Sequence, residues 1–159
     1  MLRTSATISP SAPRGVSDAQ LGELAARLRL AITRTARRLR QEAGTELSPS
    51  QTAALATIER DGPLTPSVLA DLERVRRPTA TRIVARLTEE GLVERIADPA
   101  DGRSFTVAAT PKGRALLSKM RTRKNAYLAR RLRGLDQADL AALERAAEIL
   151  EQLLEGERR

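Results

Sequence analysis

Hydrophobic and polar positions alternate along this chain in two rhythms, and each predicts a different kind of element. Long stretches near both ends repeat apolar residues every three or four positions, as amphipathic helices do. Two shorter helical patterns lie in the middle, over residues 65–72 and 77–90. Two runs of alternating residues follow them, over 93–96 and 104–109, as in β-strands. The sequence therefore predicts a mainly α chain with a small two-stranded β wing.

The second of the middle helices has an apolar stripe and a polar outer face. The stripe consists of Ala80, Ile83, Val84 and Leu87. A turn of about 100° per residue places Arg82, Pro78 and Ala85 opposite this stripe, with Thr79, Thr81 and Arg86 on its shoulders. Arginine suits guanine, and threonine suits a base edge or a thymine methyl, in the major groove of DNA. The predicted DNA contacts of this helix are Arg76, Arg77, Pro78, Thr79, Thr81, Arg82 and Arg86.

Charge favours the same interpretation without deciding it. The segment from Asp71 to Arg86 holds five arginines and two acids, a local charge of +3, which would attract phosphates. A solvated surface helix would have a similar outer face. The next segment makes that alternative weaker, because Gly91 ends the helix and the strands follow directly. Thr65 caps the first helix, so the order is that of a winged helix-turn-helix.

The predicted wing lies between the two strands. Asp98, Pro99, Asp101 and Gly102 are turn-forming residues, and Arg103 lies near the tip. We predict that Arg95, Asp98, Asp101 and Arg103 are the wing residues at the DNA. The two carboxylates are expected to cap the turn and hold Arg103, rather than to perform acid–base chemistry.

At this point the chain resembles the MarR family of bacterial transcriptional regulators, over roughly residues 18–155. The wing is the most specific part, because Asp98, Asp101 and Arg103, followed by Val107, Thr110 and Gly113, look like the family's D-x-x-D-x-R...V-x-L-T-x-x-G signature. Ala109 stands where the family usually has leucine, and Gly102 where a second basic residue is frequent. The resemblance implies that the arginine matching Arg103 enters the minor groove, that the helix over 77–90 enters the major groove, and that terminal helices form an obligate homodimer.

The ends of the chain predict assembly. One helix begins at Asp18 and stops near Gly44, a second runs from Ser48 to Gly62, a third starts at Thr110, and the last opens at Asp136. Their apolar stripes could form the core of a monomeric bundle, but pairing with a second copy is the more economical solution. The predicted dimerisation residues are Leu21, Leu28, Leu140, Leu143, Leu150 and Leu154.

The predicted organisation has four parts: a flexible arm over 1–17, a dimerisation helix over 18–46, the DNA-binding domain over 47–110, and dimerisation helices over 111–159. The arm lacks the apolar run of a signal peptide, and it is either a mobile basic arm or a functionless tail. The stretch from Lys119 to Arg133 holds seven basic residues and no acid, whereas residues 134–159 hold seven acids against three arginines.

Composition excludes several kinds of chemistry. The 159 residues carry a net charge of +8, with a pI near 11.2, which indicates a polyanionic partner. There is no cysteine and no histidine, so disulfides, zinc sites, thiol sensing and histidine-based catalysis are absent. Phe105 and Tyr127 are the only aromatic residues, which disfavours stacking on single strands. We predict no enzyme, no metal, no cofactor and no membrane span, and a cytoplasmic location.

The function predicted is that of a sequence-specific regulator of double-stranded DNA, in most such proteins a repressor, which binds an inverted-repeat operator as a homodimer. The resemblance adds a small lipophilic or aromatic effector. The alternative is a non-specific architectural protein, which the basic composition would also suit.

Overall fold

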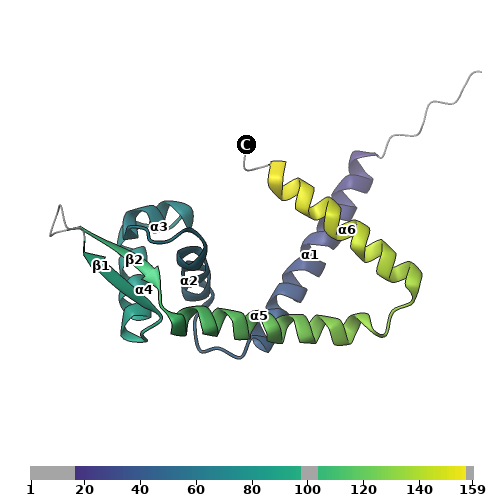
Figure 1. The fold of residues 1–159 in the computed structure, drawn as a ribbon. Helices are drawn as coiled ribbons and strands as arrows, with labels where there is room; N and C mark the ends of the chain where they lie inside the picture. Colours follow the sequence, from purple (N-terminus) through teal and green to yellow (C-terminus); the bar gives the residue numbers. More distant parts are fainter. Residues whose placement is uncertain (1–16, 98–103, 157–159) are drawn as a thin grey trace, which may run out of the picture. The chain divides into compact units, whose positions relative to one another are not determined.

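The computed structural model describes residues 17–97 and 104–156. Within them the chain forms helices and one small antiparallel sheet (Figure 1). The elements, in chain order, are α1 (Asp18–Glu42), α2 (Pro49–Asp61), α3 (Pro66–Leu72), α4 (Arg77–Glu89), β1 (Val93–Ala97), β2 (Phe105–Ala109), α5 (Pro111–Leu132) and α6 (Gln137–Gly156). The predicted class, mainly helical with a two-stranded wing, is confirmed.

The chain divides into two compact units between Arg38 and Leu39, within α1. The first unit contains most of α1, a helix in which no residue is buried. The second unit contains every other helix and both strands. Within it, α6 also lacks a buried residue in its described part, and only Leu140 and Leu150 are partly buried.

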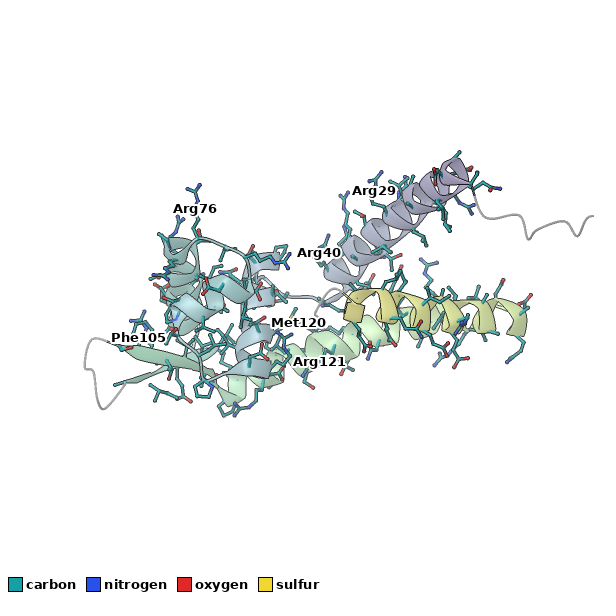
Figure 2. The ribbon with its side chains drawn as sticks, turned by 90° about the horizontal axis from the view of Figure 1, so that it is seen from above. Arg29, Arg40, Arg76, Phe105, Met120 and Arg121 are labelled. Atoms are coloured by element: carbon teal, nitrogen blue, oxygen red, sulfur yellow. The ribbon has the colours of Figure 1, made fainter. Side chains whose placement is uncertain are left out.

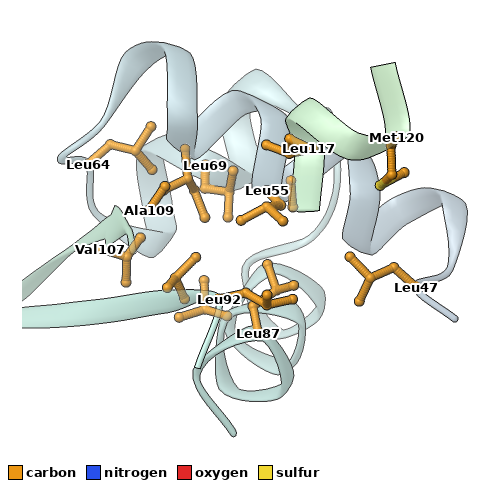
Figure 3. Close-up of a cluster of buried hydrophobic side chains, with 14 of the residues drawn as sticks. Leu47, Leu55, Leu64, Leu69, Leu87, Leu92, Val107, Ala109, Leu117 and Met120 are labelled. Atoms are coloured by element: carbon orange, nitrogen blue, oxygen red, sulfur yellow. The ribbon is translucent and has the colours of Figure 1, made fainter. Parts of the chain in front are cut away.

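The core of the second unit joins α2, α3, α4, the sheet and the start of α5 (Figure 3). Its largest fully buried side chains are Leu55, Ile58, Leu69, Leu87, Val84, Val93 and Val107. The predicted stripe of α4 is confirmed, since Ala80, Val84 and Leu87 are buried completely and Ile83 partly. The sequence therefore identifies correctly which face of α4 is turned inward.

Two short helices pack differently from what their apolar residues suggest. In α3, Leu69 and Ala70 are buried, but Val68 and Leu72 are exposed, because a helix of seven residues presents only a narrow face to the core. In α2, Ala54 is buried and the neighbouring Ala53 is exposed.

Capping side chains begin α2, α3 and α5 where the sequence predicts, whereas at α1 the cap is Ser17 and not Asp18. Ser48 and Gln51 form a reciprocal capping box at the start of α2, and Thr65 and Thr110 cap α3 and α5. One pairing was not predicted. Leu64 forms a single antiparallel bridge to Val107, with backbone N–O distances of 2.8 and 3.2 Å, so β2 has partners on both sides.

Candidate nucleic-acid interface

The turn between α3 and α4 sets the direction in which α4 leaves the first helix. Arg74 adopts a left-handed conformation, with φ at +52°, directly after Glu73 ends α3. The N–H of Val75 donates to the carbonyl of Ala70 at 2.9 Å, which closes the end of α3. The hydroxyl of Thr57, a buried residue of α2, donates to the Glu73 carboxylate at 2.5 Å. This bond ties the turn to the core, and neither Thr57 nor Glu73 was singled out from the sequence.

Most of the outer face of α4 is exposed, but Ala85, which helical geometry places opposite the stripe, is partly buried. Arg76, Arg77, Pro78, Thr81, Arg82 and Arg86 are exposed, and Thr79 is partly buried. The structure thus brings all seven predicted recognition residues onto one element, on or beside the face that avoids the core. Arg76 projects outward where α4 begins (Figure 2).

The arginines of α4 are not equivalent, because acids of the same helix hold one of them. Arg86 forms ion pairs with Glu89 at 3.3 Å and with Glu90 at 2.9 Å. Within the described residues, no hydrogen bond or ion pair engages the guanidinium of Arg82. Arg82 is therefore available to a ligand, whereas Arg86 would have to exchange its present partners for a phosphate.

Thr81 is partly committed to its own helix. Its hydroxyl donates to the carbonyl of Arg77 at 3.0 Å. The oxygen lone pairs and the methyl group remain on the exposed side, so Thr81 can accept a hydrogen bond or contact a thymine methyl.

The beginning of α4 carries positive charge without a capping side chain. Arg76 is the N-cap residue, and its side chain makes no capping hydrogen bond. Backbone N–H groups at a helix start favour anions, and here Arg76 and Arg77 add two full charges. This end of α4 suits the phosphate backbone beside a groove.

The strands of the wing are described, but its tip is not. Glu94 pairs with Ala108 and Arg95 with Val107 in the register of β1 and β2. The guanidinium of Arg95 lies 4.7 Å from the centre of the Phe105 ring, so a cation–π contact fixes it across the strands. The other predicted wing residues, Asp98, Asp101 and Arg103, lie outside the described residues.

The end of α4 and the start of α5 are held together by several hydrogen bonds. The Thr110 hydroxyl donates to the carbonyl of Gly91 at 2.7 Å, and the Lys112 ammonium donates to the carbonyl of Glu90 at 2.6 Å. Gly113 lies so close to Leu92, the residue before β1, that an added Cβ would overlap the Leu92 carbonyl oxygen. The last two positions of the predicted signature, Thr110 and Gly113, thus join the recognition helix to α5.

The predicted dimerisation residues do not form a core within one chain. Leu21 and Leu28 of α1 are exposed, as are Leu143 and Leu154 of α6, and Leu140 and Leu150 are only partly buried. Their pairing with a second copy stays a prediction.

Comparison with known proteins decides the family. The model of the MarR family matches residues 47–105, which contain α2 to β1 and the first residue of β2. An HTH-type transcriptional regulator of Mycobacterium tuberculosis is 37% identical over 140 residues, which are 87% of this chain and 96% of the relative. The chain belongs to the MarR family.

Solved MarR-type structures have the same fold. A Pseudomonas aeruginosa protein named as a transcriptional regulator has 34% identity and a TM-score of 0.77, with 87% of this chain and 97% of that one covered. A MarR family protein from Bacillus stearothermophilus has a TM-score of 0.75 at 23% identity, over 88% and 99% of the two chains. MepR of S. aureus, solved as a mutant bound to an oligodeoxyribonucleotide, has a TM-score of 0.65 at 16% identity, over 82% and 97%.

Family membership makes this chain a DNA-binding transcriptional regulator and not an enzyme. None of the helices in residues 17–97 and 104–156 is long and apolar enough to cross a membrane. The same residues contain no cluster of acids that could hold a metal ion.

Proposed function

We propose that this MarR protein acts in the cytoplasm as a homodimeric repressor of an inverted-repeat operator, and that a small lipophilic or aromatic ligand releases it. The observation that carries the proposal is the outer face of α4. There Arg82 lies opposite the buried stripe without a described partner, and Arg76 and Arg77 lie at the helix start. A free arginine in the middle and a cationic end are what base contacts and phosphate contacts require.

The dimer part of the proposal rests on the unpartnered apolar faces. Leu143 and Leu154 of α6 are 49% and 62% exposed, and Leu21 and Leu28 of α1 are 51% and 40% exposed. A second copy related by a two-fold axis would cover such faces and would present two α4 helices to the DNA. The half-sites of the operator would then be centred about 10 bp apart.

A hollow beside α4 supports the effector part. It has a volume of about 430 Å³ and lies between the α1–α2 loop, the end of α4 and the start of α5. Leu47, Leu92 and Leu116 supply apolar lining, and Lys112 adds a positive charge. The other charged lining residues are Glu46, Glu90 and Arg86, so two acids balance two bases in the hollow. The volume and the leucine lining suit a small lipophilic ligand. A ligand there would contact the residues that fix the end of α4.

The test begins with selection of binding sites from a random DNA pool, followed by footprinting. We expect protection of an inverted repeat. Arg82→Ala should weaken operator binding by about 1–3 kcal/mol and relax the base preference at one position in each half-site. Arg60→Ala, at an exposed residue of α2 that is paired with Asp61, is the matched control.

The seven basic residues between Lys119 and Arg133 favour a second candidate, an architectural protein that binds DNA without sequence preference. Such a protein would protect an extended region and bind operator and random duplexes with similar affinity at every salt concentration. Equal loss of binding to both duplexes in Arg82→Ala would also favour this candidate.

A further inference from the structure

The turn between α3 and α4 displays three arginines beside a single acid. Arg74, Arg76 and Arg77, called the turn arginines below, are exposed, and in the described part of the chain no hydrogen bond or ion pair engages their guanidinium groups. Glu73 is the one acid between residues 72 and 88. Its backbone adjoins that of Arg74 and is at most about 11 Å from that of Arg76. A carboxylate within about 10 Å, the Debye length at 0.1 M salt, would weaken the attraction between these arginines and a phosphate.

The structure directs this carboxylate toward α2. One of its oxygens accepts a hydrogen bond of 2.5 Å from the hydroxyl of Thr57. Glu73 also lines a hollow of about 260 Å³ together with Ile83, which packs against the core from α4. The pKa of Arg60 in α2 is raised by its hydrogen bond with Asp61 and, more weakly, by the charge of Glu73. The negative charge of Glu73 is thus held on the side of the turn that meets α2.

Thr57 does not need Glu73 in order to satisfy its own hydroxyl. Among the described residues it is the one buried polar or charged residue, and a buried hydroxyl requires a partner. A threonine in a helix can donate to the carbonyl four residues earlier, as Thr81 and Thr88 do in α4, at 3.0 and 2.8 Å. The hydroxyl of Thr57 instead donates to a carboxylate 16 positions away, and an ionised acceptor makes a stronger bond. This hydrogen bond therefore fixes Glu73 and does more than satisfy Thr57.

We propose that Thr57 is a positioning residue for DNA binding, because it holds the Glu73 carboxylate away from the phosphates that the turn arginines meet. This inference rests on the proposed function, in which the start of α4 lies against the phosphate backbone. Without the hydroxyl, the carboxylate has no donor in the core and turns toward water and the turn arginines. There it neutralises about one arginine in each copy and repels the phosphate. The turn keeps its shape, since the backbone hydrogen bond from Val75 to Ala70 remains.

The salt dependence of DNA binding tests this role. Thr57→Val removes the hydroxyl and nearly keeps the shape of the side chain. It should weaken binding roughly tenfold at about 50 mM salt, on operator and random duplexes alike, and reduce the slope of log affinity against log salt concentration by about one for each bound copy. The matched control, Thr88→Val, removes a hydroxyl that donates to a backbone carbonyl, and it should keep the wild-type slope. Thr57→Ser keeps the hydroxyl and loses a buried methyl group, so it should lower the melting temperature without changing the slope.

Substitutions of Glu73 separate its charge from the shape of the turn. Glu73→Gln added to Thr57→Val should restore the wild-type slope and affinity, because the amide carries no charge, although this double variant should be no more stable than Thr57→Val. Glu73→Gln alone should bind DNA as the wild type does. Glu73→Asp has a carboxylate one methylene shorter, too short for the hydroxyl of Thr57 unless the turn shifts. It should therefore repeat the effect of Thr57→Val, and it replaces that variant if Thr57→Val does not fold.

Arg76→Ala distinguishes a failure of this inference from a failure of the proposed function. It should reduce the slope by about one for each bound copy if the start of α4 contacts phosphates. An unchanged slope in Arg76→Ala would overturn the proposed interface itself. A reduced slope there, with a wild-type slope in both Thr57→Val and Glu73→Asp, would overturn only the role of Thr57. That role would also be overturned if Thr57→Val lost affinity that Glu73→Gln did not restore, since the bond would then only support the shape of the turn.

Discussion

At the residue scale, Gly113 and Arg82 differ in what the surrounding structure demands of the side chain. Gly113 is required by space, because α5 begins against the backbone of Leu92. Arg82 is not required by packing, because it is exposed and has no partner among the described residues. We therefore expect a substitution of Gly113 to change stability and, under the proposed function, a substitution of Arg82 to change DNA binding.

Gly113→Ala should lower the free energy of unfolding by about 1–3 kcal/mol, since its Cβ would meet backbone atoms that cannot move independently. Urea denaturation at a fixed protein concentration measures this change. Gly134→Ala is the matched control, because its added Cβ would lie 3.7 Å from the nearest oxygen, an ordinary contact. Equal stability of the two variants would show that α5 can shift away from Leu92 without cost.

At the element scale, α3 and α4 each end at a residue with a left-handed backbone conformation, but the residue types differ. Both helices close with a residue in the left-handed region, Arg74 at φ +52° and Gly91 at φ +67°. Glycine takes this conformation readily, whereas any side chain adds strain there. The helix-turn-helix therefore contains one relaxed corner, after α4, and one strained corner, before it.

Arg74→Gly should raise the free energy of unfolding by up to about 1 kcal/mol, because the relief of strain exceeds the added freedom of the unfolded chain. Thermal and urea unfolding measure the gain. Arg74→Ala keeps the strained backbone and removes the charge, so it should show no such gain. If both variants lose operator affinity equally, that loss reports the guanidinium alone.

The contact between α2 and α5 makes stability depend on pH. Arg121 binds Glu59 through two N–O contacts of 2.9 and 3.1 Å, and these hydrogen bonds lower the pKa of the Glu59 carboxyl. A lowered pKa in the folded state means that the contribution is present above the ordinary pKa of glutamate, near 4.5. It is lost as the pH falls through the folded value.

Arg121→Met should therefore raise the pKa of Glu59 toward its ordinary value, which an NMR titration of the side-chain carboxyl measures. The loss of stability at neutral pH should be modest, about 0.2–1 kcal/mol, because the Arg121 side chain is half exposed. At a pH below the folded pKa the variant and the wild type should differ less. A pKa of Glu59 that does not move would show that the pair is not formed in solution.

How far the sequence predicts these elements depends on the range of the interactions. The stripe of α4, the caps Ser48, Thr65 and Thr110 and the stop at Gly91 follow from local spacing, and all are found as predicted. Two contacts join residues that are distant in sequence, namely the hydrogen bond between Thr57 and Glu73 and the bridge between Leu64 and Val107. The periodicity of the sequence cannot predict such contacts.

The candidate site divides in the same way. An outward position such as that of Arg82 follows from helical geometry alone. The ion pairs of Arg86 with Glu89 and Glu90 depend on the side-chain rotamers of these residues. The pattern of residue types alone does not distinguish Arg86 from Arg82.

At the scale of the whole molecule, the described chain leaves much of its apolar surface uncovered. Large exposed hydrophobic residues gather on α1 and α6, among them Leu24, Ile32 and Leu153. A single chain of this composition would expose more apolar surface than soluble monomers usually tolerate. The proposed second copy would remove that surface from water, and assembly would then stabilise the terminal helices.

Leu143→Glu combined with Leu150→Glu should therefore convert the protein to monomer or aggregate, because assembly would bury unpaired charges in an apolar seam. Light scattering at micromolar concentration measures the molar mass. Ala141→Glu with Gln152→Glu adds two charges to the other side of α6 and should preserve the dimer. A stable wild-type monomer would contradict the prediction, because the prediction requires the wild type to be a dimer.

The bonds between the end of α4 and the start of α5 have a mechanical consequence. Thr110 and Lys112 donate hydrogen bonds to the carbonyls of Gly91 and Glu90, and Gly113 lies in close contact with Leu92. Because of these contacts, we expect α4 to move together with the start of α5. A helix of 22 residues is a stiff rod of about 33 Å at about 1.5 Å per residue. A tilt of about 5° moves the far end of such a rod by about 3 Å, close to the rise of one base pair, roughly 3.4 Å. If α5 tilts about its C-terminal end, a few degrees would therefore displace α4 by about the spacing of one base pair on the proposed operator.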